Sequence, residues 1–196
     1  MERVLQLNAP FLHGEASGLR MGEQVLLSGV VYTARDAAHM RMCRTISNGG
    51  RLNIDLEGAV IFYAGPAPAR PGSPIGSVGP TTSSRMDPYT PSLLDLGVKA
   101  MIGKGVRSGS VVDAMKKNGA VYLGAAGGIA ALLARTVISS RIADYEDLGP
   151  EAVRELKICR MPLVVLIDSL GNSLYREGPA RYREQGSTAS CSQSFP

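Results

Sequence analysis

Short runs of β-branched and aliphatic residues alternate along this chain with segments of helical periodicity. The strand-like runs are 24–33, 59–63, 98–102, 120–123 and 163–168. Strands that alternate with helices are joined by crossover connections, so the pattern predicts an α/β fold. The chain has 196 residues, of which 44% are apolar, and this is enough for one sizeable core. We therefore expect one domain.

Three of the intervening segments carry the end signals of helices. The first spans 37–46, has apolar residues at three-residue spacing, and stops before an Asn-Gly-Gly sequence. The second starts at Thr90-Pro91, an N-cap residue followed by proline in the first turn, and ends at Gly97. The third begins at Ser110 and is closed by an Asn-Gly pair. These segments predict three helices, each in a connection between two strands.

Two segments lack any regular period. Residues 65–80 are rich in Pro and Gly, and loops of this length in compact domains are usually functional. Residues 185–196 are Ser-rich with almost no apolar content, which predicts a disordered tail. We therefore place the folded catalytic-type domain at 1–184 and the tail at 185–196.

The charge of the chain restricts the class of partner. The net charge is +4, but the Lys and Arg residues are scattered among Asp and Glu. Aromatic residues are only 5%, and there is no Trp. Nucleic-acid-binding proteins usually concentrate positive charge in a stripe, often with exposed aromatics for stacking, so we expect no nucleic-acid partner. A locally positive pocket for an acidic metabolite remains open.

The chain shows no sign of export or membrane insertion. Residues 1–7 turn polar too early to form a signal-peptide core. The uncharged stretch 118–134 is shorter than the roughly 20 residues of a membrane span, and we interpret it as a buried strand followed by a buried helix. The three cysteines, Cys43, Cys159 and Cys191, form no CxxC pair, which favours a reducing compartment. We expect a cytoplasmic protein with no membrane partner.

The segment 79–89, Gly-Pro-Thr-Thr-Ser-Ser-Arg-Met-Asp-Pro-Tyr, gathers hydroxyl groups and a guanidinium at the exit of the long loop. It stands directly before a predicted helix, where free backbone N–H groups and the positive helix end attract anions. By composition this is an anion site. The alternative is a Ser/Thr-rich turn that only caps the following helix, and the residues alone leave both interpretations open.

Two further cations follow predicted strands. Arg35 would lie at the C-terminal end of a strand, the edge where open α/β sheets bind ligands, although a solvated ion pair with Asp36 is the alternative. Lys104 stands between two glycines that let the backbone bend closely around a ligand, and the alternative is a turn with a surface lysine. The glycine-rich segment 124–128 matches no nucleotide-binding motif, so we favour close backbone packing there.

Five segments occur together in an order that is typical of one enzyme family. They are Thr33-Ala34-Arg35-Asp36 with His39, Gly79-Pro80-Thr81-Thr82 with Arg85-Met86-Asp87, Gly103-Lys104-Gly105, residues 122–131, and Tyr145-Glu146-Asp147-Leu148-Gly149-Pro150-Glu151-Ala152. In these segments the chain resembles the β subunit of class I iron–sulfur hydro-lyases, a family that includes class I fumarate hydratase and L(+)-tartrate dehydratase. The resemblance covers nearly the whole length up to the tail, and the Gly-Pro-Thr-Thr…Arg segment is its most specific part.

The resemblance implies a fold, an activity and a partner. It implies a single mixed-sheet, swivelling-type β/α domain with helices packed around a central sheet or barrel. The implied activity is that of a hydro-lyase that reversibly hydrates fumarate to malate. The implied cofactor is a [4Fe-4S] cluster with one iron open to substrate. That cluster would be held by an α subunit in an α2β2 assembly, and this chain would supply no metal ligand.

The resemblance also assigns roles to residues. It makes Thr81 the catalytic base, and it makes Arg35, Arg85 and Lys104 the groups that bind the substrate carboxylates. Removing a proton next to a carboxylate loads a second negative charge onto that group, so donors placed in advance stabilise the transition state. Arg grips a carboxylate with two parallel hydrogen bonds, and Lys adds a point charge. Three residues are expected to orient the arginines: Asp36, His39 and Asp87.

Two alternatives to fumarate hydration stay open. The first is the β subunit of L(+)-tartrate dehydratase or of a related hydroxy-diacid dehydratase, which differs by a few pocket contacts. The sequence 86–91 favours the fumarate branch. The second is a non-catalytic module that binds a dicarboxylate. Retention of Thr81 beside three cations favours catalysis, because a sensor would need the cations and not the hydroxyl group.

Overall fold

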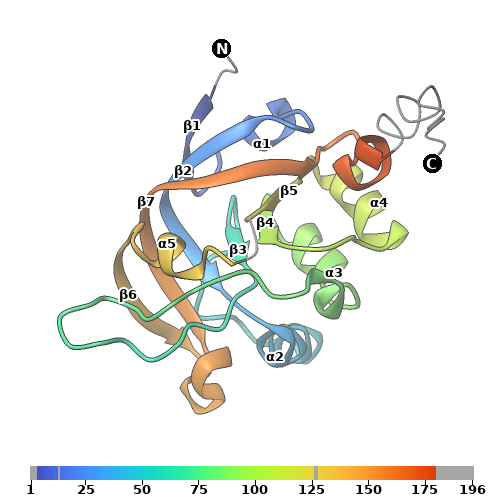
Figure 1. Cartoon of the computed structure of the whole chain (residues 1–196). Coiled ribbons are helices and arrows are strands. Elements are labelled where there is room, and N and C mark those ends of the chain that lie inside the picture. Colours follow the sequence, from blue (N-terminus) through green and yellow to red (C-terminus); the bar gives the residue numbers. More distant parts are fainter. Residues whose placement is uncertain (1–3, 13, 126–127, 180–196) are drawn as a thin grey trace, which may run out of the picture.

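The structure is a computed structural model and describes residues 4–12, 14–125 and 128–179 (Figure 1). The predicted tail at 185–196 and the domain boundary at 184 lie outside this range. The elements in chain order are β1 (Val4–Ala9), α1 (Glu15–Gly18), β2 (Gln24–Thr33), α2 (Asp36–Ser47), β3 (Val60–Phe62), the 3-10 helix η1 (Ser83–Met86), α3 (Thr90–Asp95), β4 (Ala100–Gly103), α4 (Gly109–Asn118), β5 (Val121–Gly124), α5 (Ala130–Ala134), β6 (Val137–Asp144), the 3-10 helix η2 (Glu146–Glu151) and β7 (Val153–Ile167).

The strands form one mixed sheet that closes on itself. Within the described residues the order is β1-β2-β3-β4-β5-β7-β6, and β7 also pairs with β2. Strands β1 to β5 run parallel to one another, whereas β7 is antiparallel to β2, β5 and β6. The β2–β7 pairing closes β2, β3, β4, β5 and β7 into a barrel, and Figure 1 shows α2, α3 and α4 gathered on one side of it. The predicted α/β fold with helices around a central barrel is confirmed.

Alternation of side chains along the central strands creates two hydrophobic clusters. Val60 and Phe62 of β3 belong to the cluster shared by all five barrel strands. Ile61 and Tyr63 point the other way, into a cluster with residues of α2, α3 and α4. Strands buried on both faces read as continuous apolar runs, which explains why these short strands were visible in the sequence.

The edges of the fold differ from the sequence-based expectations. All five predicted strands and all three predicted helices overlap observed elements, but β1 and β6 were not predicted, and β7 extends far beyond the predicted run 163–168. The expected buried helix within 118–134 is wrong, because α5 has five residues and only Leu133 is buried. The third helix begins at Gly109, with Ser108 rather than Ser110 at the N-cap position.

The helices of the described residues also bear on membrane insertion. None of them combines the length and the apolar character that a membrane-crossing helix needs.

Candidate functional site

Three of the predicted site residues meet at one edge of the barrel. Strands β2, β3 and β4 are parallel neighbours, so their C-terminal ends lie along the same edge. Arg35 follows the end of β2 by two residues, and Lys104 directly follows β4. Thr81 reaches the end of β3 through its backbone, because its N–H group donates to the carbonyl of Tyr63 at 2.7 Å. This edge is where ligands bind in open parallel sheets.

The exit of the long loop 65–80 is attached to β4 by its backbone. Thr82 forms a parallel β-bridge with Lys104, and the N–H group of Ser83 donates to the Lys104 carbonyl at 3.0 Å. Helix η1 follows directly and carries Arg85, two residues after Ser83. The segment that carries Thr81 and Arg85 is thereby fixed against the residue that carries the lysine.

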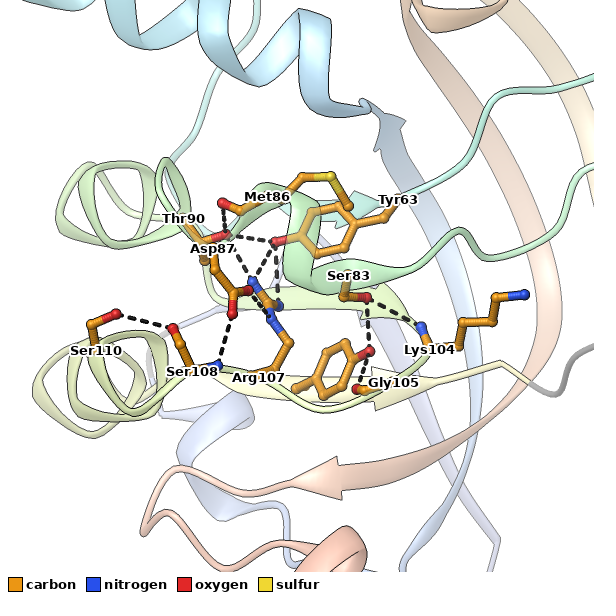
Figure 2. Close-up of polar contacts among 11 residues, drawn as sticks. Tyr63, Ser83, Met86, Asp87, Thr90, Lys104, Gly105, Arg107, Ser108 and Ser110 are labelled. Carbon is orange, nitrogen blue, oxygen red and sulfur yellow. Dashed lines mark hydrogen bonds and ion pairs between the residues drawn. The ribbon is translucent and has the colours of Figure 1, made fainter.

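Arg85 and Lys104 keep their charges exposed. Both residues are exposed, and neither side chain makes a hydrogen bond or ion pair with another residue in the described part of the chain. Figure 2 shows the Lys104 side chain extending away from the neighbouring polar contacts. Cations that are not already paired remain available to a ligand carboxylate.

A buried guanidinium lies behind this edge. Nε of Arg107 donates to Oδ1 of Asp87 at 2.7 Å, and Nη2 donates to Oγ1 of Thr90 at 2.9 Å (Figure 2). The other Asp87 oxygen accepts the N–H group of Ser108 at 2.7 Å, at the start of α4. Burial alone would lower the pKa of Arg107, but Tyr63 and the Asp87 carboxylate outweigh it and hold the pKa above its usual value. Arg107 therefore stays charged and joins the η1–α3 segment to the β4–α4 segment.

A relay of hydroxyl groups connects this interior to the backbone of Lys104. The Lys104 N–H group donates to Ser83 Oγ at 3.2 Å, and Ser83 Oγ lies 2.8 Å from the hydroxyl of Tyr122, which donates to the carbonyl of Gly105 at 3.1 Å (Figure 2). Burial raises the pKa of Tyr122, so its hydroxyl keeps its proton. Gly103 permits this packing, because a Cβ atom there would lie 2.0 Å from Ser83 Oγ.

Arg35 is already paired within the chain. Its Nη2 lies 3.0 Å from Oε1 of Glu151 and 3.5 Å from Oδ1 of Asp36. Its stem crosses Gly65, where a Cβ atom would lie 3.1 Å from Arg35 Cδ. The orientation of the Arg35 side chain is therefore fixed by contacts within the chain. In this it differs from Arg85 and Lys104, which are unpaired among the described residues.

His39 is fully buried beneath Arg35. Its Nδ1 lies 2.8 Å from the carbonyl oxygen of Arg35, which can only accept, so Nδ1 carries the proton. Burial lowers the pKa of His39 to about 4, so the ring is neutral at pH 7. The ring packs edge-on against Tyr63, with centroids 5.2 Å apart. Among the described residues its Nε2 has no partner.

The residues expected to orient the arginines occupy three different positions. Asp36 contacts the Arg35 guanidinium, His39 contacts the Arg35 backbone, and Asp87 contacts Arg107 instead of Arg35 or Arg85. Sequence reasoning missed Arg107 and Glu151. Glu151 lies inside one of the segments that carried the family resemblance and Arg107 two residues after another, but spacing alone could not show which way their side chains point.

The cysteines of the described residues do not form a metal site. Cys43 is half-buried on α2, where burial raises its pKa and disfavours the thiolate, and Cys159 is exposed on β7. No group of three or more His, Cys, Asp or Glu residues in 4–12, 14–125 and 128–179 is arranged to hold a metal ion. These residues do not fit an iron–sulfur cluster. Cys191 lies outside the described residues.

Comparison with known proteins gives one consistent family. A family model described as the fumarase C-terminus matches residues 1–178. The chain is 36% identical over 177 residues to the aerobic class I fumarate hydratase of Escherichia coli K12, covering 88% of this chain and 32% of that protein. It is 39% identical over 182 residues to the mitochondrial fumarate hydratase 1 of Leishmania major, covering 89% and 32%.

A third relative is close to this chain in length. It is a protein of Methanocaldococcus jannaschii provisionally named L(+)-tartrate dehydratase subunit beta, 38% identical over 165 residues that cover 81% of this chain and 85% of the relative. By contrast, the chain spans about a third of the length of the fumarate hydratases it matches. From the family match and these relatives, the chain belongs to the fumarase C-terminal family, which is shared by class I fumarate hydratases and a tartrate dehydratase beta subunit.

Proposed function

We propose that this chain is the β-type part of an iron–sulfur hydro-lyase that reversibly hydrates fumarate to malate. In this reaction the chain binds the two substrate carboxylates and accepts or returns one proton. The observation that carries the proposal is the placement of Arg35, Thr81 and Lys104 at one barrel edge, with Arg85 on the adjoining helix η1. Membership of the family supports the reaction class.

The exposed cations provide the electrostatic part of the mechanism. Proton removal next to a carboxylate develops a second negative charge on that group. Arg85 and Lys104, which have no ion partner in the described residues, meet that charge without first breaking an internal contact. A donor placed in this way contributes about 2.7–4 kcal/mol of transition-state stabilisation.

Thr81 is proposed as the group that accepts the proton. The backbone of Thr81 is held by the hydrogen bond to the Tyr63 carbonyl, and Thr81 is only partly exposed. An aliphatic hydroxyl is a weak acid, so it needs positive charge nearby to become an effective base. Lys104, whose backbone bridges Thr82, and Arg85 bring that charge to the same segment.

We further propose that a partner α subunit holds the [4Fe-4S] cluster, in a cytoplasmic α2β2 assembly. Support comes from the relative of similar length, which is named as a subunit. Half a site on each chain would also account for the exposure of Arg85 and Lys104.

L(+)-tartrate dehydration is the second candidate activity. The specific observation in its favour is the coverage of the archaeal relative, which matches this chain over 85% of its own length at 38% identity. Tartrate differs from malate by one hydroxyl group, so a few contacts in the site would decide between them.

The test is a substrate panel on the complex, purified without oxygen after co-expression with the iron–sulfur chain of an adjacent gene. We expect turnover of fumarate and malate to exceed turnover of tartrate. Thr81→Ala and Arg85→Ala should each lower kcat by about 10²–10³-fold while the complex still assembles. Arg51→Ala, at an exposed arginine outside the edge, is the matched control. Full rates in both site variants would remove these residues from the mechanism.

A further inference from the structure

Glu151 connects two parts of the molecule that are far apart in sequence. It is the last residue of η2 and lies in the segment 145–152, to which the sequence assigned no role. Its Oε1 lies 3.0 Å from Arg35 Nη2, and its Oε2 accepts the backbone N–H group of Ala37 at 3.3 Å. One carboxylate therefore holds both the guanidinium of Arg35 and the first turn of α2, which begins next to Arg35.

The segment that carries Glu151 is itself anchored. Arg41 of α2 pairs with Asp147 of η2 at 2.6 Å, and Thr45 of α2 lies within hydrogen-bonding distance of the Tyr145 hydroxyl. Helix α2 and η2 thus contact one another at several points along their lengths. A carboxylate on such a support has a defined position relative to Arg35.

Glu151 leaves part of the Arg35 guanidinium free. The ion pairs use Nη2, whereas Nη1 donates to no residue in the described ranges, and Nε is buried there without a partner. A guanidinium has five N–H donors in one plane, so fixing one nitrogen sets the direction of the others. Because Nε is buried, Nη1 is the donor that is left for a ligand carboxylate.

We propose that Glu151 is a positioning residue for Arg35, which it holds in the orientation that receives a substrate carboxylate. Glu151 acts through Arg35 and does not itself touch the substrate. The kinetic part of this inference rests on the proposed function. The orientation of Arg35 is a property of the chain alone and can be tested separately.

The kinetic test uses Glu151→Gln in the complex of the full chain with its iron–sulfur partner. Glutamine keeps an oxygen that accepts from Ala37 but loses the charge that orients Arg35. We expect kcat/KM for fumarate to fall by about 10–100-fold, by analogy with residues that orient the ligands of a metal. A lower KM with unchanged kcat would show that Glu151 competes with the substrate and would overturn the proposal. An unchanged kcat/KM would overturn it as well.

Two controls separate positioning from a general effect. Glu146 is an exposed glutamate of the same segment, and its side chain forms no hydrogen bond or ion pair with the described residues. Glu146→Gln should therefore leave kcat/KM unchanged. In an Arg35→Ala background, Glu151→Gln should change kcat/KM by less than about twofold, because residues that act through one another are not additive. A full effect of Glu151→Gln without Arg35 would contradict the proposed pathway.

The structural test needs no substrate. In the chain labelled with ¹⁵N-arginine, the Nε–H signal of Arg35, assigned by its loss in Arg35→Lys, should show a restricted group in the wild type. In Glu151→Gln its order parameter should fall toward the values below about 0.6 that mark flexible groups. Equal order in both proteins would overturn the positioning role. A complex inactive on fumarate whose Arg35 still shows this loss of order would overturn the proposed function alone.

Discussion

Lys104 and Arg107 are two cations on the same short connection, three positions apart, in opposite surroundings. The Lys104 side chain is exposed and has no ion partner among the described residues. Arg107 is 7% exposed, pairs with Asp87, and stacks on the rings of Tyr63 and Tyr122 at 5.2 and 5.1 Å. A positively charged side chain is thus unpaired and available to a ligand at one position, and forms a buried structural ion pair at the other.

The difference teaches how the molecule keeps an open charge in place. A buried ion pair holds its geometry only when its remaining donors and acceptors are also satisfied, and Asp87 meets this condition through Ser108 and Arg107. The ion pair between Arg107 and Asp87 joins the segment of Arg85 to the segment of Lys104. The exposed cations can therefore remain unpaired without losing their position.

The largest expected effect is on stability, from Arg107→Ala. Removing this side chain leaves the Asp87 carboxylate without its partner in a largely buried place, which costs about 3–5 kcal/mol in the free energy of unfolding. Urea unfolding of the purified chain measures it, with exposed Arg51→Ala as the control. A loss below about 1 kcal/mol would mean that the two cations are not as different as the structure shows.

The opposite behaviour is expected for Lys104→Ala. Turnover of the complex should fall by about 10²–10³-fold, because an unpaired cation at the site is lost. The free energy of unfolding should change by no more than about 0.5 kcal/mol, as for other exposed residues. The exposed Lys157→Ala on β7 should change neither quantity. If Lys104→Ala unfolds the chain instead, the lysine belongs to the scaffold.

His39 makes the interior sensitive to pH. Its pKa is about 4 in the folded chain and near 6.5 when unfolded, so the neutral ring contributes its full stability above pH 6.5. As pH falls from 6.5 toward 4, the unfolded chain takes up the proton first, and stability should decrease by at most roughly 3 kcal/mol. His39→Gln should flatten this slope in urea unfolding between pH 4 and 7. An unchanged slope would show that His39 does not titrate in this way.

The smallest effect is expected at the boundary between the two regions. Ser83→Ala removes the hydroxyl that accepts from the Lys104 N–H group and contacts Tyr122. Leaving these buried groups short of a partner costs about 1–3 kcal/mol in the free energy of unfolding. Ser84→Ala, at the exposed neighbour in the same turn, should be neutral. Equal values for both serines would show that the relay carries little stability.

The centre of the fold was predictable because β2 to β5 are apolar on both faces. The outer strands were not, because β6 has a single buried residue and so no apolar run. Much of β7 alternates buried residues with exposed ones such as Lys157 and Arg160, a period of two that a search for continuous apolar runs does not find. The closure of the barrel depends on the β2–β7 pairing, which joins distant parts of the chain and leaves no local signal.

The candidate site was predictable in part. Glycine and proline signals located Thr81, Arg85 and Lys104 at loop exits, and parallel pairing of β3 with β4 brings those exits together. The partners of Arg107 and Arg35 were hidden, because they depend on which charged side chain turns inward. That choice follows from packing across elements and not from spacing along one of them.

The last long strand has a consequence for biosynthesis. Strand β7 pairs with β2 near the beginning of the chain and with β5 and β6 near its own position. A nascent chain emerging from the ribosome has therefore made β2 to β5 before the strand that joins the edges of β2 and β5 exists. Until Ile167 has left the exit tunnel, the residues that later fill the barrel stay uncovered. Folding of the barrel must then finish after β7 has been translated, and contacts so distant in sequence form slowly.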